Sequence, residues 1–307
     1  MKEKSVGLIC SDGLFNFNGK KFNFFPSVGL KVTGACNNSC PFCCEPNRKQ
    51  SVYAIDNFIR ITKILRQLGT MRLCFTGGEP LLYPNIDRLM KHTKTLGFYN
   101  LLLTGDGALL MKKYNELLPS IDAIRFSIHA VGTQHDEIVG QPGAFYEMEK
   151  ALDALTKEKV PCFVTTVVTR LNLGLISEIA SWCFNKKVQT FFLFGLMRSG
   201  KGWAFIDKHG EVLEAELYEI TAELERKYSP DQLKIIVYEY NKNAECILIY
   251  GDGRVVIDPY PVLPSFQLEI GNIISNTPSE ILDRFNKDPE NYSGHYDHLK
   301  KWNKDLT

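Results

Sequence analysis

The chain has 307 residues, enough for one large α/β domain or two smaller ones, and its 44% hydrophobic and 23% charged residues are those of an ordinary globular protein. A formal net charge of +1 gives no basic surface for nucleic acid, so we expect no partner of that class. The sequence shows neither a signal peptide nor an apolar run of membrane-spanning length, so we expect a cytoplasmic protein with no membrane partner.

Six short apolar segments alternate with longer amphipathic segments in the first two thirds of the chain. They are residues 28–34, 72–78, 98–105, 123–130, 162–169 and 190–197. Each is rich in β-branched or aromatic residues and bounded by glycine or polar residues, as buried parallel strands are. The segments between them have helical periodicity: Phe145, Met148, Leu152 and Leu155 share one face of one helix, and Asn85 could cap another. This alternation predicts an α/β fold on a parallel sheet, either an open barrel or a doubly wound sheet.

The pattern changes after a helical segment at 211–228. Three strand-like segments follow, and Asp252 and Gly253 predict a hairpin between the last two of them. Thr277 or Ser279 could then cap a short helix. We therefore expect a small α+β appendage after the parallel region. The predicted parts are an N-terminal strand or hairpin extension at 1–27, a core at 28–230, the appendage at 231–290 and a tail at 291–307.

Four cysteines lie close together directly after the first predicted strand. Cys36, Cys40 and Cys43 have the spacing Cys-x3-Cys-x2-Cys, and Cys44 follows at once. In a reducing compartment such a cluster is more often metal-binding or catalytic than disulfide-bonded. Three thiolates can hold three corners of an iron–sulfur cube and leave one iron open. Zinc in a structural or scaffold protein is the alternative, but it takes four ligands, and adjacent residues rarely bind one ion together.

These cysteines also carry a resemblance to a known family. The segment Cys36–Cys43, with an aromatic residue before its third cysteine, and the segment Thr76–Pro80, with the sequence TGGEP at the end of the next strand, resemble two motifs of the radical S-adenosylmethionine (radical SAM) superfamily. Three further segments are similar to motifs of the family: 101–110, where Asp106 is a departure, 124–145, where His129 replaces the usual Asp, and 167–172. The resemblance covers roughly residues 28–197.

The resemblance implies a fold, a reaction and cofactors. The fold would be a partial (β/α)6 TIM-like barrel with a small α+β C-terminal extension. Cys36, Cys40 and Cys43 would hold one 4Fe–4S cluster whose open iron binds SAM. Reductive cleavage of SAM would give a 5′-deoxyadenosyl radical that abstracts a hydrogen atom from the substrate. The protein would then be an oxygen-sensitive biosynthetic enzyme with an electron donor such as flavodoxin or ferredoxin.

The resemblance also carries SAM contacts onto positions of this sequence. Residues at the ends of the predicted strands, where parallel α/β proteins bind ligands, would surround SAM. The methionine amine would be bound by the TGGEP turn, at Gly77, Gly78, Glu79 and Pro80. The methionine carboxylate or the ribose would be bound by the polar residues Ser127, Thr104 and Asn172, and adenine would pack against Phe42 and Leu196.

Substrate contacts are expected from Asp106, His129 and Arg198. For polar residues at strand ends such as Ser127 and Thr104, satisfaction of the local backbone is the alternative role. We expect His135 to be a core histidine and the isolated cysteines to be buried and inert, although Cys74, Cys162 or Cys246 could quench a substrate radical, as cysteines do in some members of the family.

Residues 246–282 resemble the auxiliary-cluster extension called SPASM or Twitch. Such extensions hold a second cluster through several cysteines, but here only Cys246 is present, and residues 258–261 replace an expected Pro-Cys. One thiolate cannot hold a cluster, so we expect a degenerate extension without one. The resemblance then implies a redox-neutral outcome, namely epimerisation, rearrangement, elimination or carbon–carbon chemistry. The substrate would be a small molecule or a peptide, and a ribosomal-peptide maturase is the alternative.

Overall fold

The computed structural model describes residues 15–17, 20–45, 53–196, 200–238, 247–257 and 268–287. A ten-stranded sheet runs through this part of the chain in the order β12-β11-β10-β3-β4-β5-β6-β7-β8-β9. The strands that pair in parallel in chain order are β3 (Ser27–Thr33), β4 (Arg72–Gly77), β5 (Tyr99–Thr104), β6 (Ala123–Ser127), β7 (Cys162–Val168), β8 (Thr190–Gly195) and β9 (Lys234–Tyr238).

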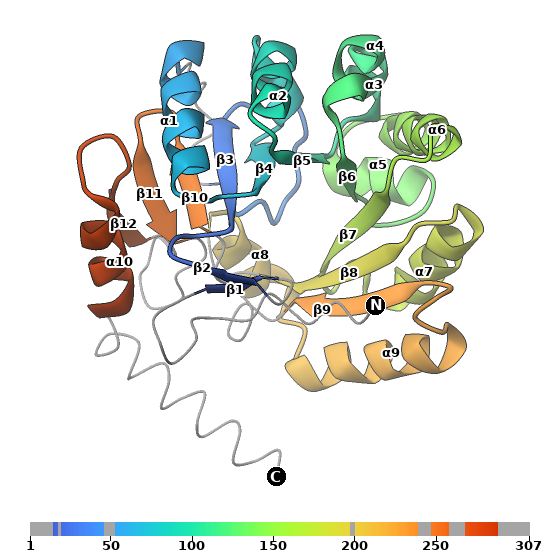
Figure 1. The fold of residues 1–307 in the computed structure, drawn as a ribbon. Coiled ribbons are helices and arrows are strands. Elements are labelled where there is room, and N and C mark those ends of the chain that lie inside the picture. The colour runs from blue at the N-terminus through green and yellow to red at the C-terminus, as the bar shows by residue number, and fades with distance from the viewer. Residues whose placement is uncertain are drawn as a thin grey trace.

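The strand order identifies the sheet as an open barrel. From β3 to β9 each strand pairs in parallel with the one before it, and the order never reverses. A doubly wound sheet would reverse direction at a switch point and carry helices on both faces. Figure 1 instead shows a curved sheet with its helices on the outside. The predicted partial barrel is therefore confirmed, and β9 adds one more parallel strand at its far edge.

The helices between the strands bury one apolar stripe each against the outside of the sheet. The larger ones are α1 (Ile55–Gln67), α2 (Ile86–Thr95), α6 (Ala144–Lys157), α7 (Ile176–Asn185) and α9 (Glu214–Lys227). Shorter ones are η1 (Pro80–Leu82), α3 (Gly107–Lys112), α4 (Tyr114–Leu117), η2 (Leu118–Ser120), α5 (Thr133–Val139), η3 (Leu173–Leu175) and α8 (Gly202–His209).

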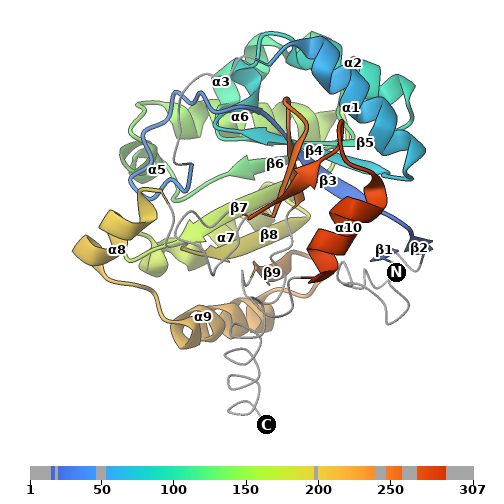
Figure 2. The same cartoon turned by 90° about the vertical axis from the view of Figure 1, so that its left-hand side faces the viewer.

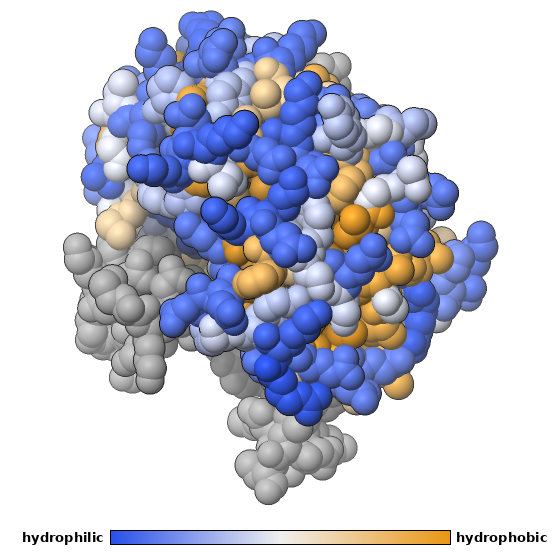
Figure 3. Space-filling model, turned by 90° about the vertical axis from the view of Figure 1, so that its right-hand side faces the viewer, coloured by the Kyte–Doolittle hydropathy of each residue, from blue (hydrophilic) through white to orange (hydrophobic). Residues whose placement is uncertain are grey.

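The predicted periodicity of α6 is confirmed, because Phe145, Met148, Leu152 and Leu155 are all buried, each side chain contributing about 1.5–3 kcal/mol. Asn85 occupies the N-cap of α2, but its side chain makes no capping hydrogen bond and instead accepts one from Arg88 at 3.3 Å. The side of the molecule that carries α6, α7 and α9 is largely hydrophilic, with hydrophobic side chains gathered in one area (Figure 3). No helix in the described ranges is both long and apolar enough to cross a membrane.

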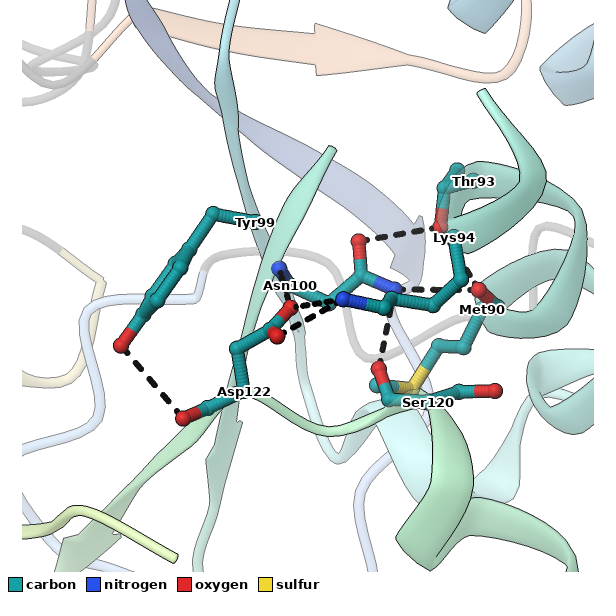
Figure 4. Close-up of polar contacts among 7 residues, drawn as sticks. All are labelled: Met90, Thr93, Lys94, Tyr99, Asn100, Ser120 and Asp122. Carbon is teal, nitrogen blue, oxygen red and sulfur yellow. Dashed lines mark hydrogen bonds and ion pairs between the residues drawn. The ribbon is translucent and has the colours of Figure 1, made fainter. Parts of the chain in front are cut away.

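A polar network fixes the end of the barrel at which β5 and β6 begin (Figure 4). The Asn100 amide is fully buried; its Nδ2 donates to the carbonyl oxygens of Met90 and Ser120, both at 3.0 Å, and its Oδ1 accepts from the Thr93 hydroxyl at 3.0 Å. The Asp122 carboxylate accepts from the Asn100 backbone N–H at 2.7 Å. The network joins α2, β5 and the turn before β6, so it sets the register of the barrel at that end.

The appendage extends the same sheet. Strand β10 (Ile247–Tyr250) pairs with β3 in parallel, and β11 (Arg254–Ile257) and β12 (Leu268–Asn272) follow in antiparallel order. The predicted hairpin is confirmed, since Gly253 takes a φ of +89° and its N–H donates to Tyr250 at 2.9 Å. Thr277 accepts a hydrogen bond from the Glu280 N–H at the start of α10 (Pro278–Lys287), as the predicted cap requires.

Near the N-terminus, β1 (Phe15–Phe17) and β2 (Lys20–Phe22) form a separate antiparallel hairpin. Strand β9 continues the parallel order although it lies beyond residue 230, where the predicted core ends. The predicted domain boundaries stay predictions.

Candidate functional site

The cysteine loop, residues 34–45, lies across the ends at which the parallel strands finish. The Asn38 side chain donates to the Gly105 carbonyl oxygen at 3.0 Å, and the Asn37 side chain donates to the Asp106 carboxylate. The Ser39 N–H donates to the Val139 carbonyl oxygen at 2.6 Å. Figure 2 shows α5 and α8 on this same side of the barrel. These contacts hold the middle of the loop over β5 and α5.

The second half of the loop is held by charge and by backbone contacts. The buried Lys31 of β3 forms an ion pair with Glu45, which follows the last cysteine by one residue. The Cys43 carbonyl oxygen accepts from the Lys201 N–H at 2.9 Å, and the Cys43 N–H donates to the Cys40 carbonyl oxygen at 3.4 Å. The loop is therefore fixed on both sides of its cysteines.

A cavity of about 180 Å³ lies under this loop, and the four cysteines of the loop share its lining. Cys36, Cys40 and Cys43 are half-buried and line it together with the exposed Cys44. The other lining residues come from seven segments of the barrel and its loops, the cysteine loop included: Asn38, Phe42, Gly78, Glu79, Gly105, Ser127, His129, Val139, Thr165, Val167 and Leu196. Cys44 is therefore a solvent-exposed thiol at the cavity and not a packed or shielded one.

The donor set fits an iron–sulfur cube better than a zinc ion. Among the described residues, no three His, Cys, Asp or Glu side chains are placed to share one metal ion. Zinc needs three or four such ligands around a single centre. A cube binds each thiolate on a different iron, so Cys36, Cys40 and Cys43 need only face a common space. They do so in this cavity.

The two glycines of the TGGEP turn are required by close backbone packing. A Cβ on Gly77 would lie 2.2 Å from the Thr33 carbonyl oxygen, and one on Gly78 would lie 2.3 Å from that of Ala35. The Gly78 N–H donates to the Thr33 carbonyl oxygen at 2.8 Å. Only glycine lets the end of β4 approach the start of the cysteine loop this closely. Gly78 lines the cavity, whereas Gly77 lies behind it.

Glu79 places a buried carboxylate on the cavity wall. Its Oε1 accepts hydrogen bonds from the Leu81 N–H at 3.0 Å and the Thr104 hydroxyl at 2.9 Å, and its Oε2 accepts from the Gly105 N–H at 2.9 Å. Burial raises the pKa of Glu79 to about 7, and these three hydrogen bonds oppose that rise. Pro80 begins η1 directly after it. A cation in the cavity would restore the ionised form, as an ammonium group would.

Thr104 and Asp106 act within the protein. The Thr104 hydroxyl, besides donating to Glu79, accepts from the Asp106 N–H at 3.0 Å, and Thr104 does not reach the cavity. The Asp106 carboxylate caps α3 by accepting from the Leu109 N–H at 2.8 Å, and it also accepts from Asn37. Both side chains therefore stabilise the structure around the cavity through these contacts. A ligand contact by either remains a prediction.

The opposite wall of the cavity comes from β6 and β7. Ser127 and His129 line it, one at the end of β6 and one just beyond it, and their contacts with SAM and with substrate stay predictions. His129 is 5% exposed, and its Nδ1 has no hydrogen-bond partner in the described part of the chain. Burial lowers the pKa of His129 to about 3, so its imidazole is neutral. The Phe42 ring packs edge-on against it at 5.0 Å and against Phe205 at 5.8 Å.

Asn172 is buried but lies outside the cavity lining. Its Oδ1 accepts from the Thr169 N–H at 2.7 Å, and its Nδ2 donates to the carbonyl oxygens of His129 and Val167, both at 3.0 Å. It thus joins the ends of β6 and β7 and supports His129 from behind. Arg198 and Cys246 lie outside the described residues, as do Cys10 and the segment 258–261.

Thr165 is a cavity residue that the sequence analysis missed. It pairs in register with Ser127, and its hydroxyl is buried without a hydrogen-bond partner among the described residues. Alternation along β7 could have indicated it, because Phe163, Thr165 and Val167 share the less buried face of that strand. The predicted core role of His135 is confirmed: it is fully buried and stacks at 5.9 Å from His129.

Comparison with known proteins identifies relatives of this chain. The family model of the radical SAM superfamily matches residues 30–183. The sporulation killing factor maturation protein SkfB of Bacillus subtilis (strain 168) is 24% identical over 241 residues, which are 76% of this chain and 58% of SkfB. The chain thus spans less than two thirds of the length of this relative.

Solved structures share the fold. SuiB of Streptococcus suis bound to S-adenosylmethionine superposes with a TM-score of 0.70 at 16% identity, covering 89% of this chain and 68% of SuiB. SuiB bound to its precursor peptide SuiA gives a TM-score of 0.68 at 16% identity, over 85% of this chain and 64% of SuiB. At this identity the likeness establishes the architecture alone.

Proposed function

The chain belongs to the radical SAM superfamily, and from this premise we propose that it cleaves SAM at a single 4Fe–4S cluster held by Cys36, Cys40 and Cys43. The observation that carries the proposal is the shared cavity: these three thiols face the same space as the Gly78–Glu79 turn and Ser127. Cofactors of this kind supply the difficult chemistry, here the one-electron cleavage of the SAM sulfonium to a 5′-deoxyadenosyl radical that takes a hydrogen atom from the substrate.

Different residues of the cavity would bind different parts of SAM. Glu79, already oriented by three hydrogen-bond donors, would accept the methionine ammonium, and its pKa would fall as it does so. Ser127 on the facing wall would donate to the methionine carboxylate. Phe42 and Leu196 would supply apolar surface for adenine and exclude water from the reacting atoms. Thr104 and Asn172 would position the groups that touch SAM.

We propose a peptide as the substrate, with a flavodoxin or ferredoxin as the source of the electron. The support is that SkfB is a maturation protein of a killing factor and that SuiB binds a precursor peptide. A small molecule is the second candidate. Only Cys246 is present in the segment 246–282, so we propose no auxiliary cluster and a redox-neutral outcome in which the hydrogen is returned or replaced. Residues 231–290 would then be a cluster-free extension of the 28–230 core.

Anaerobic reconstitution with iron and sulfide tests this proposal. The expected product is a brown protein with about four irons per chain that releases 5′-deoxyadenosine when reduced in the presence of SAM. A colourless protein that retains zinc would overturn the enzyme proposal. A count of about eight irons would overturn only the single-cluster proposal and leave SAM cleavage standing. Addition of a candidate precursor peptide should increase the yield of 5′-deoxyadenosine, and the matched scrambled peptide should not.

A further inference from the structure

A small apolar cluster beside the cysteine loop is separate from the main core of the barrel. This satellite cluster joins the loop, the segment after β6, α5 and α8, and its buried members are Phe42, Ala130, Ile138 and Phe205. The residues packed against it are Cys40, Val167, Leu175 and Leu196. Phe42 and three of these four, all but Leu175, also line the cavity. The satellite cluster therefore lies directly behind the apolar wall of the cavity.

Helix α8 is attached to the protein through few side chains. Of its eight residues, Gly202, Phe205 and Ile206 are the buried ones. The Phe205 ring packs edge-on against Phe42 at 5.8 Å, and the ring of His209, one turn later, lies 4.6 Å from it. A helix this short has little stability of its own, so its position depends on such contacts.

The segment just before α8 is packed against the backbone of the third cysteine. Gly200 has a φ of +54°, and a Cβ there would lie 2.6 Å from the Cys43 carbonyl oxygen and 2.8 Å from that of Cys44. Only glycine permits this approach. The Lys201 N–H donates to the same Cys43 oxygen at 2.9 Å. The α8 segment thus contacts the cysteine loop twice, at the Cys43 backbone and at the Phe42 ring.

These contacts place α8 outside the residues that face the cluster cavity. The Phe42 ring lies between His129, at 5.0 Å, and Phe205, at 5.8 Å. His129 lines the cavity, whereas Phe205 does not. The apolar layer around a metal centre controls the access of solvent, and solvent exposure changes the properties of an iron–sulfur cluster.

We propose that α8 is a cover that shields the cluster from water and oxygen, and that Phe205 is its positioning residue, holding the cysteine loop closed through Phe42 and Cys40. The inference rests on the proposed function for the presence of the cluster. The shielding of Cys40 by α8 is a property of the protein without the cluster, so it can be measured separately.

Alkylation of the cluster-free chain by N-ethylmaleimide tests the cover in the absence of cofactors. Fragmentation mass spectrometry gives separate rates for Cys40, which is half-buried, Cys44, which is exposed, and Cys183, which is fully buried. In Phe205→Ala we expect the Cys40 rate to rise at least about threefold relative to Cys44, because truncation of a buried Phe favours local opening. Cys183 should stay protected, which shows that the rest of the chain remains folded.

Matched variants separate the cover from a general loss of stability. Phe205→Leu keeps most of the apolar volume and should hold the Cys40 rate within about twofold of wild type. Phe184→Ala makes the same truncation at an exposed position of α7 and should change nothing. Gly200→Ala keeps every side chain of the satellite cluster but forces the start of α8 away from Cys43, so it should raise the Cys40 rate even if Phe205→Ala unfolds. An unchanged Cys40 rate in every variant that stays folded would overturn the proposal.

Exposure of the reconstituted protein to air gives the second readout. At equal initial iron content, the iron–sulfur absorbance should decay at least about threefold faster in Phe205→Ala than in wild type or Phe184→Ala. Equal decay would overturn the shielding of the cluster. A wild type that forms no cluster would count against the proposed function, and the alkylation rates would still decide whether α8 covers the cysteine loop.

Discussion

The Thr104 hydroxyl donates a hydrogen bond of 2.9 Å to Oε1 of Glu79, and this contact joins the ends of the neighbouring strands β4 and β5. The same hydroxyl accepts from the Asp106 N–H, and Glu79 is the nearer of its two acceptors, since the other, the Asp106 carbonyl oxygen, lies at 3.5 Å. Thr104 itself lies outside the cavity lining, and Glu79 lies within it. The Glu79 carboxylate is therefore held in place from behind, before any ligand binds.

Loss of this contact should weaken SAM binding without abolishing it. In Thr104→Val the carboxylate keeps its two backbone donors but loses a donor that favours the ionised form. We expect the dissociation constant of SAM to rise about threefold to tenfold, with little change in the rate at which bound SAM is cleaved. Isothermal titration of the reconstituted protein measures the first quantity, and Thr95→Val on the surface is the control. An unchanged SAM affinity would contradict the positioning role.

The raised pKa of Glu79 predicts a specific dependence of stability on pH. Its folded-state pKa is about 7, above the ordinary value of 4.5, so the native state retains a proton that the unfolded state releases between these values. The contribution of Glu79 to stability is therefore fully present below pH 4.5 and is lost as pH rises toward 7. A shift of this size corresponds to about 3 kcal/mol. Chemical denaturation of the cluster-free protein at pH 5 and pH 7 measures it.

Glu79→Gln is the reference that isolates this group. His129 and His135 act in the opposite direction, because their lowered pKa values remove stability as pH falls below 6.5. Both histidines remain in the variant, so the difference between wild type and Glu79→Gln reports Glu79 alone. Wild type should lose stability relative to the variant as pH rises from 5 to 7. A flat difference would show that the carboxyl group is ionised throughout.

The four cysteines should separate into three ligands and one dispensable thiol. Cys36→Ala, Cys40→Ala and Cys43→Ala each remove a corner of the cube, so we expect loss of the iron absorbance and of 5′-deoxyadenosine release. Cys44→Ala removes an exposed side chain beside the same cavity and should retain both. Iron content and product yield after identical reconstitution give the comparison. A cluster that survives Cys43→Ala but not Cys44→Ala would exchange their roles.

Asn172 should prove to be a brace between strands and not a SAM contact. Asn172→Ala removes the partners of the His129 and Val167 carbonyl oxygens and of the Thr169 N–H, of which the contacts with His129 and Thr169 are buried, so the free energy of unfolding should fall by about 2–4 kcal/mol. Urea denaturation measures this change. SAM titration of the folded variant at low temperature should show less than about a threefold loss of affinity. A larger loss with unchanged stability would place Asn172 against SAM.

The sequence located residues of the candidate site wherever a family motif coincides with the end of a predicted strand. Cys36, Gly78, Ser127 and His129 line the cavity because the carboxyl ends of parallel strands meet at one edge, and that rule needs only the order of elements. Thr165 was missed because its segment was interpreted as a strand buried on both faces. The alternation of more and less buried residues along β7 places Thr165 with Phe163 and Val167 on the less buried face, and this period of two is the signal that could have indicated it.

The partners of polar side chains were also beyond prediction. Nothing near Thr104 in the chain indicates that its hydroxyl meets Glu79, which lies 25 residues earlier. The contact of Asn37 with Asp106 likewise joins segments 69 residues apart. Such long-range pairs depend on how neighbouring strand ends are staggered, and a sequence pattern fixes the strands but not their stagger. The carried-over motifs therefore located the edge of the barrel that holds the candidate site, but they did not assign each side chain its contact.

The Asn100 network at the other end of the barrel provides a test of stability that leaves the cavity unchanged. Asn100→Ala removes the amide donor of the Met90 and Ser120 carbonyl oxygens and one acceptor of the Thr93 hydroxyl, which keeps its hydrogen bond to the Met90 carbonyl oxygen; the loss should cost about 2–4 kcal/mol. Because these contacts lie where β5 and β6 begin, and the cavity lies where they end, SAM affinity of the folded protein should not change. Differential scanning calorimetry and SAM titration measure the two quantities.

Tyr99→Phe is the matched control, since its hydroxyl contacts the Asp122 carbonyl oxygen at 3.4 Å in an exposed position (Figure 4). Its removal should change stability by less than about 0.5 kcal/mol. A loss in Asn100→Ala no larger than that of Tyr99→Phe would show that the network adds nothing to the fold. A large loss accompanied by weakened SAM binding would show instead that the two ends of the barrel are energetically coupled, which the separation of the two sites argues against.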